Sequence, residues 1–479
     1  MNGAPFIGDA WVHLKIAEET VRFGRYRFAD YNTQWPLVNL LIALTMLVPG
    51  LPPLMASQMI PVLSGLAALP FYALCRRLGL SRGAALFGIA FLNFNPLYTY
   101  FTFSGAVMKE TASYYLVLAL LMMSTMKLRG KGAAYLTGVM LGLGLILGHH
   151  FAAMIVALYF CSYLAYGALG FLEGRRVEVK MLASVGATYL LVFLARNLMI
   201  YQSIGSWLPV FTLSDGLVLA SCLLLIWVFG FSEARDLRVV QVGVVVAAFV
   251  ICVIVLRGGI LAILTPTEPI SFGELRNYIV VGVLSVLGLA LAMKSTEVRS
   301  FAVPAVGWTI FAFIFDLTEV GLMIFTKALH YFGILLALGG AFVAHLVQRR
   351  WKGGNVALLA AALVLVYFSS FGMAMALEGP GAYTVSEVRC VERVAPFTER
   401  IALRGDLRSS YLWQYLSKSR LRDMTSAPRP GEVFVLTATN RRVGFLLGYQ
   451  WAPAQTMLQR LGRYNLLVNS PELSLLETL

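Results

Sequence analysis

Apolar residues occur in long runs along most of this chain, and short polar stretches separate the runs. Most runs are roughly 20 residues long, the length that an α-helix needs to cross the hydrocarbon core of a bilayer. Basic residues follow every second run, and such loops face the cytoplasm under the positive-inside rule. The pattern predicts about twelve crossings. These are 54–75, 84–101, 111–126, 133–148, 151–172, 181–201, 217–231, 239–256, 278–293, 301–315, 329–347 and 356–377.

Both ends of the chain differ from this pattern. Residues 1–53 predict an outer-face loop with an amphipathic helix and, at Trp35–Pro49, a short juxtamembrane helix. Residues 54–377 form the predicted membrane domain, and residues 378–479, richer in charge and turns, predict a small soluble α/β domain on the outer face. Its predicted strands are 399–404 and 432–438, its helices are 408–416 and 454–461, and its closing hairpin is 464–468 with 473–476.

Composition supports this division. Hydrophobic residues make up 59% of the 479 residues and charged residues 13%, about half the charged share of a typical soluble protein. The chain is therefore predicted to be an all-α polytopic membrane protein with a small C-terminal α/β domain. The net charge of +14 comes mostly from loops between apolar runs, where basic residues set topology and meet lipid headgroups. We expect membrane lipids, and no nucleic acid, as partners.

Three acidic motifs fall on the predicted outer face. The first is Asp9, followed by His13 and Glu18. The second ends in Lys109-Glu110, and the third is Thr265-Pro-Thr-Glu268. Ionisable groups at a membrane boundary are costly unless they are paired, hydrated or bound to a ligand. Three carboxylates could converge on one divalent cation, Mn²⁺ or Mg²⁺. The alternatives are a surface amphipathic helix for the first motif and a helix cap or snorkelling pair for Lys109-Glu110.

Basic residues on the same predicted face could bind an anion. His149 and His150 precede an apolar run and could bind a phosphate or assist proton transfer. Lys327 and His330 lie at the predicted outer start of another helix. For both groups, an interfacial position facing water is an equally good interpretation. Arg196 is a further outer-face cation, and arginine can bind phosphate oxygens bidentately.

These motifs resemble those of the GT-C-type membrane glycosyltransferases, and most of all the catalytic subunit of archaeal and bacterial oligosaccharyltransferases. Gly8-Asp9-x-Trp11-x-His13 is similar to the motif of the family's first outer loop, so that Asp9 matches its metal-binding acid. Ser104-Gly105 through Glu110 resembles the second-loop motif Ser-Gly-x-x-Asp-x-Asp/Glu. Thr265-x-x-Glu268 resembles the Thr-x-x-Glu motif of the long outer loop.

The resemblance implies a GT-C-like fold on the cell membrane and an inverting transfer of sugar from a polyprenyl (dolichyl)-phosphate or -diphosphate donor to an extracytoplasmic protein, lipid or glycan. Asp9, Glu110 and Glu268 would be catalytic and would bind the divalent metal. The substrate-binding residues would be His13, Lys109, His149, His150, Lys327 and His330.

The chain also departs from the family pattern. Met108 occupies the position of the first acid in the second motif, and the Trp-Trp-Asp-Tyr-Gly motif that reads a sequon is absent. The family has a thirteen-helix core, which the chain matches if a first helix is missing from this sequence. Two other functions stay open: a transporter or flippase of a lipid-linked or anionic substrate, and a catalytically inactive scaffold subunit.

Overall fold

The computed structural model describes most of the chain. The described residues are 10–28, 32–94, 99, 102, 108–126, 131–172, 180–204, 220, 222–229, 238–258, 282–289, 291–315, 319–378, 383–398, 401–417, 421–422, 429–447, 450–452, 454–461 and 464–478. Asp9 and Glu268 lie outside these ranges, as do parts of the predicted crossings 84–101, 217–231 and 278–293.

Helices form the body of the molecule. The first part of the chain gives α1 (Ala10–Phe23), η1 (Asn32–Gln34), α2 (Pro36–Leu47), α3 (Pro53–Ser57), α4 (Met59–Gly65), α5 (Ala68–Arg77), α6 (Arg82–Asn93) and α8 (Met108–Ser124). The second part gives α9 (Lys131–Gly148), α10 (His150–Leu172), α11 (Lys180–Ile204), α13 (Arg238–Gly258), α16 (Thr296–Phe315), α17 (Glu319–Arg350) and α18 (Gly354–Glu378).

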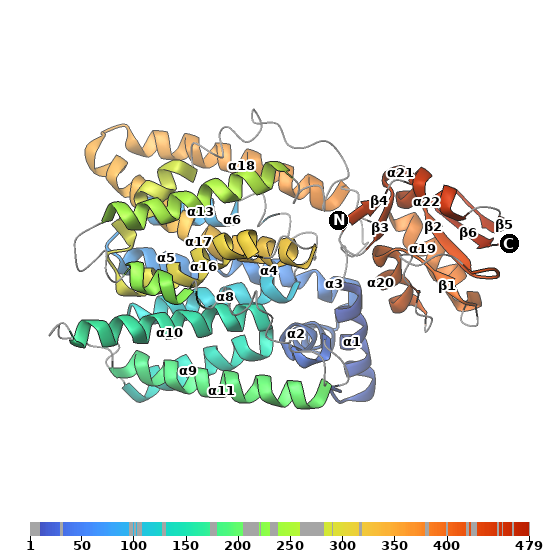
Figure 1. Cartoon of the computed structure of the whole chain (residues 1–479), viewed down its shortest axis with the longest axis horizontal. Helices are drawn as coiled ribbons and strands as arrows, with labels where there is room; N and C mark the ends of the chain where they lie inside the picture. The colour runs from blue at the N-terminus through green and yellow to red at the C-terminus, as the bar shows by residue number, and fades with distance from the viewer. Residues whose placement is uncertain are drawn as a thin grey trace.

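The long helices run side by side as a bundle, whereas α1 and α2 have a different direction (Figure 1). In that view α1 lies across one end of the bundle and α2 is seen end-on. We call this the α1 end of the bundle. The structure places a helix, Pro36–Leu47, within the predicted Trp35–Pro49 segment, and its juxtamembrane position stays a prediction.

The predicted crossing 54–75 is one path broken into three helices. Breaks fall at Gln58, between α3 and α4, and at Leu66-Ala67, between α4 and α5. Proline has no amide hydrogen to donate to the carbonyl four residues earlier. Pro61 therefore removes the donor four residues after Ser57, and Pro70 removes the one four residues after Leu66, whose carbonyl accepts from the Leu69 N–H at 3.0 Å instead. Both breaks lie next to these carbonyls.

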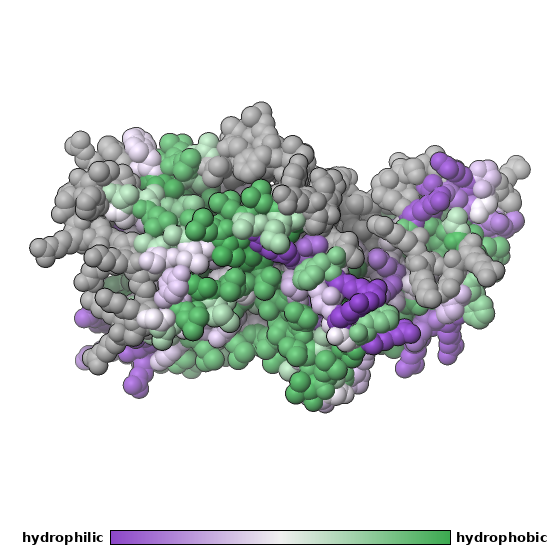
Figure 2. Space-filling model, turned by 90° about the horizontal axis from the view of Figure 1, so that it is seen from below, coloured by the Kyte–Doolittle hydropathy of each residue, from purple (hydrophilic) through white to green (hydrophobic). Residues whose placement is uncertain are grey.

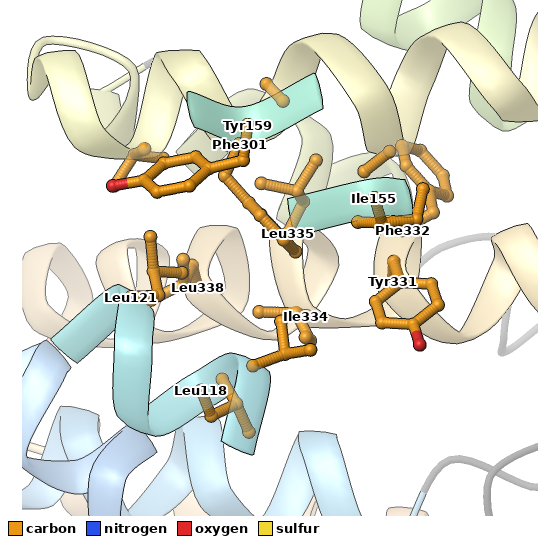
Figure 3. Close-up of a cluster of buried hydrophobic side chains, with 14 of the residues drawn as sticks. Leu118, Leu121, Ile155, Tyr159, Phe301, Tyr331, Phe332, Ile334, Leu335 and Leu338 are labelled. Carbon is orange, nitrogen blue, oxygen red and sulfur yellow. The ribbon is translucent and has the colours of Figure 1, made fainter. Parts of the chain in front are cut away.

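The core of the bundle is apolar and closely packed. Figure 3 shows side chains of α8, α10, α16 and α17 meeting there, among them Leu118, Ile155, Phe301 and Leu335. Helix α17 also packs directly against residues 282–289, because a Cβ atom on Gly339 would lie 1.8 Å from the Ser285 carbonyl oxygen. Only glycine permits this distance between the two backbones.

The face of the bundle seen in Figure 2 is largely apolar as well. Exposed leucines recur at helical spacing, such as Leu191, Leu194 and Leu198 on α11. Within the described ranges, four helical segments are long and apolar enough to cross a membrane: the α3–α5 path Pro53–Arg77, and His150–Ala168, Leu182–Ile200 and His330–Arg350. The exposed apolar bands and these helices are typical of a polytopic membrane protein.

The C-terminal domain combines helices with a mixed sheet, as the sequence predicts. Its elements are α19 (Val385–Val394), η2 (Ala395–Thr398), β1 (Leu403–Arg404), α20 (Leu407–Leu416), β2 (Val433–Thr437), α21 (Ala438–Val443), β3 (Phe445–Leu447), β4 (Gln450–Ala452), α22 (Ala454–Leu461), β5 (Tyr464–Asn469) and β6 (Leu473–Thr478). The four-stranded sheet has the order β1-β2-β6-β5, in which only the β1–β2 pair is parallel. Strands β3 and β4 form a separate antiparallel pair.

A buried ion pair lies in this domain. Arg408 and Glu387 have fully buried side chains, with Nη2 3.2 Å from Oε2. The Arg408 guanidinium also stacks over the Tyr383 ring at 3.6 Å. Burial alone would raise the pKa of Glu387, but Arg408 and hydrogen bonds from Thr384 and Thr439 outweigh it and hold that pKa below its ordinary value.

One helix start differs from the prediction. Helix α17 begins at Glu319, ten residues before the expected start at Leu329. No proline interrupts residues 319–329, and an acidic residue is favoured in the first turn of a helix. Lys327 and His330 therefore lie inside a helix and not at its start.

Candidate functional site

The central contact of the α1 end joins Glu110 and His149. Glu110 is in the first turn of α8, and His149 is the single residue between α9 and α10. His149 Nε2 lies 3.3 Å from Glu110 Oε1, and the two side chains are 2% and 4% exposed. A Cβ atom on Gly148 would lie 2.6 Å from Ser113 Oγ, so glycine allows the α9–α10 joint to approach α8. This approach brings the histidine to the carboxylate.

Lys109 lies beside this pair and is also buried. Its Nζ donates a hydrogen bond of 2.9 Å to Asn32 Oδ1 in η1. Both side chains are buried, and Glu110 lies in the first turn of α8, where a helix cap is expected. The two side chains place a cation and a carboxylate in the interior, where charges are costly unless they have partners.

Asn39 connects this cluster to α1. Its Nδ2 donates to Tyr26 Oη at 2.7 Å and to the Asn32 carbonyl oxygen at 3.3 Å. Its Oδ1 lies 2.7 Å from Nδ1 of His13, which is fully buried. Since oxygen is the amide's acceptor, the His13 Nδ1 carries the proton in this contact. His13 of α1 is thus linked through two asparagines to Lys109 of α8.

His150 and Arg196 approach the same segment from other helices. The rings of His150 and Trp35 are 5.5 Å apart, and those of His149 and His150 are 4.3 Å apart. Arg196 Nη2 donates to the Gln34 carbonyl oxygen at 2.9 Å. The interfacial interpretation is wrong for His149, which is buried, whereas His150 is half-buried.

Helix α17 contributes His330 and Tyr331. The hydroxyl of Tyr114 in α8 donates to the His330 carbonyl oxygen at 3.1 Å, and the two rings are 6.0 Å apart. The hydroxyl of Tyr331 points away from the other labelled core side chains in Figure 3. Tyr331 is close enough to Glu110 for the two to interact electrostatically.

The structure thus brings six of the nine predicted site residues to one end of the bundle: His13, Lys109, Glu110, His149, His150 and His330. Asp9 and Glu268 lie outside the described residues, and so does the side chain of Lys327. The predicted convergence of three carboxylates remains a prediction. In the part of the chain that the structure describes, no three His, Cys, Asp or Glu side chains are placed to hold a metal ion.

Sequence reasoning missed Asn39, Asn32 and Tyr331. Asn39 offered a signal, because it is a polar residue inside the apolar stretch Pro36–Leu47, and such residues usually face a polar partner. Asn32 and Tyr331 offered none. Their roles come from contacts between segments far apart in the sequence.

Chemically, the cluster combines two capacities in a largely buried setting. Glu110 and His149 can exchange a proton, since a carboxylate and an imidazole in contact can act as acid and base. Lys109 supplies a fixed positive charge that could offset a developing negative one. Low water content strengthens both effects.

The fold places the chain in a known structural class. Its structure is similar to that of ArnT from Cupriavidus metallidurans bound to undecaprenyl phosphate, with a TM-score of 0.52 and 14% identity over 100% of this chain and 95% of that one. It is also similar to the Archaeoglobus fulgidus oligosaccharyltransferase in complex with Zn and sulfate, with a TM-score of 0.51 and 14% identity over 88% of this chain and 54% of that one.

The chain therefore has a GT-C-type fold, as its motifs predict, and is a polytopic membrane protein with a small C-terminal α/β domain. At this low identity the likeness establishes the fold alone. No family model matches the sequence, and no curated protein matches it.

Proposed function

We propose that this protein is a membrane glycosyltransferase that takes a sugar from a polyprenyl-phosphate or -diphosphate donor and gives it to an extracytoplasmic acceptor. The observation that carries the proposal is the buried Lys109–Glu110–His149 cluster at the α1 end of a GT-C-type bundle. The ArnT structure with undecaprenyl phosphate supports a donor of this chemical class.

The roles follow from the bonds that such a transfer makes and breaks. An acceptor oxygen or nitrogen attacks the anomeric carbon of the sugar, and the bond from that carbon to the phosphate oxygen breaks. The acceptor proton goes to a carboxylate, for which Glu110, Asp9 and Glu268 are the candidates. The electron pair leaves on the phosphate, where Lys109, Lys327 and the histidines 13, 149, 150 and 330 would offset the charge.

A divalent ion, Mn²⁺ or Mg²⁺, fits this site in part. Glu110 and His149 offer one oxygen and one nitrogen ligand, both within the cluster. Asp9 and Glu268 would have to supply the remaining protein ligands, since hard divalent cations prefer oxygen. When bound, the ion would neutralise negative charge on the donor phosphate.

The test is sugar transfer by the full chain in proteoliposomes, with polyprenyl-phosphate-linked and polyprenyl-diphosphate-linked sugars. Mn²⁺ or Mg²⁺ is added in one series, and a chelator in the other. We expect Asp9→Ala and Glu268→Ala to abolish transfer, whereas Glu19→Ala, at an exposed carboxylate of α1, retains it.

The outcomes separate the proposed roles. Metal-dependent transfer that needs Asp9 supports an acidic metal site, whereas transfer that ignores the metal but needs Asp9 makes that residue the general base. Full transfer by both Ala variants contradicts the assigned site. No transfer from any donor, together with uptake of substrate into the vesicles, would replace the proposal by a transporter.

A further inference from the structure

Helix α1 has two opposite faces that meet different parts of the protein. At 3.6 residues per turn, Trp11, Lys15 and Glu18 fall within an arc of about 60°. His13 lies on the other side of the helix, about 200° from Trp11. The first face meets the C-terminal domain, and the second meets α2 of the membrane bundle.

The face towards the C-terminal domain is closely packed. Trp11 is fully buried between two tyrosines, with its ring 6.0 Å from that of Tyr383 and 4.9 Å from that of Tyr415. Lys15 Nζ donates to the Gln414 carbonyl oxygen at 2.5 Å, and the Tyr415 hydroxyl donates to Glu18 Oε1 at 2.9 Å. Contacts between domains of one chain permit relative motion by default unless the interface is large and hydrophobic.

This interface belongs to one hydrophobic core that crosses the domain boundary. Trp11, Leu14 and Ala17 of α1 are buried in the same cluster as Trp413 of α20 and Val433 of β2. Burial also raises the pKa of Glu18, and the hydrogen bond from Tyr415 partly offsets that rise. The carboxylate is thus half-buried at the edge of this interface, with Tyr415 as its partner.

The opposite face continues into the candidate site. His13 contacts Asn39, Asn39 donates to the carbonyl of Asn32, and the Asn32 side chain accepts from Lys109. A continuous series of contacts thus runs from Tyr415 of the C-terminal domain, through α1, to the first turn of α8.

We propose that the C-terminal domain is a positioning element for the site: by holding the Trp11–Lys15–Glu18 face of α1, it sets where α1 places His13. Tyr415 and Tyr383 are then positioning residues for the transfer. The importance of this role for catalysis rests on the proposed function, whereas the mechanical coupling does not.

The first measurement is hydrogen exchange by the full-length protein in lipid nanodiscs. Tyr415→Phe removes only the hydroxyl that bonds Glu18 and keeps the ring against Trp11. We expect faster amide exchange in α1 and α2 and unchanged exchange in α16. Tyr464→Phe, at an exposed tyrosine of β5, is the matched control and should change neither. Lys15→Met breaks the second bond across the interface and gives an independent variant.

The second measurement is sugar transfer by the same variants. One hydrogen bond contributes about 0.5–1.5 kcal/mol, so Tyr415→Phe should lower kcat about two- to tenfold. The donor KM should change less than kcat, because His13 is the single proposed donor-binding side chain on α1. In the double variant of Tyr415→Phe and Asn39→Leu, the fold-loss of kcat should be smaller than the product of the two single losses, because both substitutions act through α1.

Each outcome decides one of the two proposals. Wild-type exchange and wild-type kcat in both Tyr415→Phe and Lys15→Met overturn the positioning role, even if transfer is observed. Faster exchange in α1 and α2 with no transfer by the wild type supports the coupling and removes the proposed function. Fully multiplicative losses in the double variant also contradict a shared route through α1.

Discussion

Replacing Glu110 by glutamine separates the chemistry of the central pair from its contribution to stability. The side chain keeps its shape and can remain in contact with His149, whose Nε2 now lies 3.3 Å from the carboxylate. With His149 protonated, two unit charges that far apart attract by about 5 kcal/mol at an effective dielectric constant of about 20. Desolvation of two groups as buried as these offsets most of that gain. The net loss of unfolding free energy in Glu110→Gln should therefore be about 1–3 kcal/mol.

The loss of transfer should be much larger. Positioned acids and bases contribute about 10²- to 10⁴-fold to rates, and glutamine cannot take up a proton at neutral pH. The assay compares single-turnover transfer with the thermal midpoint of the same detergent-purified sample. Wild-type turnover by Glu110→Gln would show that the reaction does not use the carboxylate. A midpoint lowered by more than ten degrees would show that the pair is mainly structural.

Three further predictions concern stability. Arg408→Met should destabilise the C-terminal domain by about 3–5 kcal/mol in a denaturant titration, because it leaves Glu387 buried without its ion partner. The depressed pKa of Glu387 gives stability that is present above the unfolded-state pKa and lost as pH falls through the folded-state pKa, and Glu387→Gln should flatten that acid limb. Gly339→Ala should destabilise the protein by about 1–3 kcal/mol through overpacking and so lower its thermal midpoint. Gly132→Ala should leave the midpoint unchanged, because a Cβ there meets nothing within 4 Å.

Local sequence patterns predicted which helices and strands exist better than they predicted where these elements begin and end. Runs such as 133–148 and 356–377 were predicted within a few residues, because a membrane helix needs both length and an unbroken apolar face. The strands around Val433 and the hairpin around Asn469-Ser-Pro were predicted from alternation and turn residues. The start of α17 was missed because Lys327, a charged residue before an apolar run, was interpreted as the boundary of the helix.

The candidate site was only partly accessible from the sequence. Glu110 and His149 were found as separate motifs, but their contact depends on Gly148 allowing the α9–α10 joint to approach α8. The burial of Lys109 depends on Asn32, which is 77 residues away in the chain. Periodicity reports which face of one helix is apolar, and it does not report which other segment covers that face.

The contact between α1 and the C-terminal domain also has a consequence for biosynthesis. The bonds of Lys15 and Glu18 to that domain join residues 399 and 397 positions apart. At about 5–20 residues per second, a ribosome needs about 20–80 seconds to add the missing partner. During that interval Trp11 lacks both of its tyrosine neighbours, although α1 has already left the ribosome. A chain that ends before residue 400 would therefore lose the packing of α1, near its N-terminus, as well as the C-terminal domain.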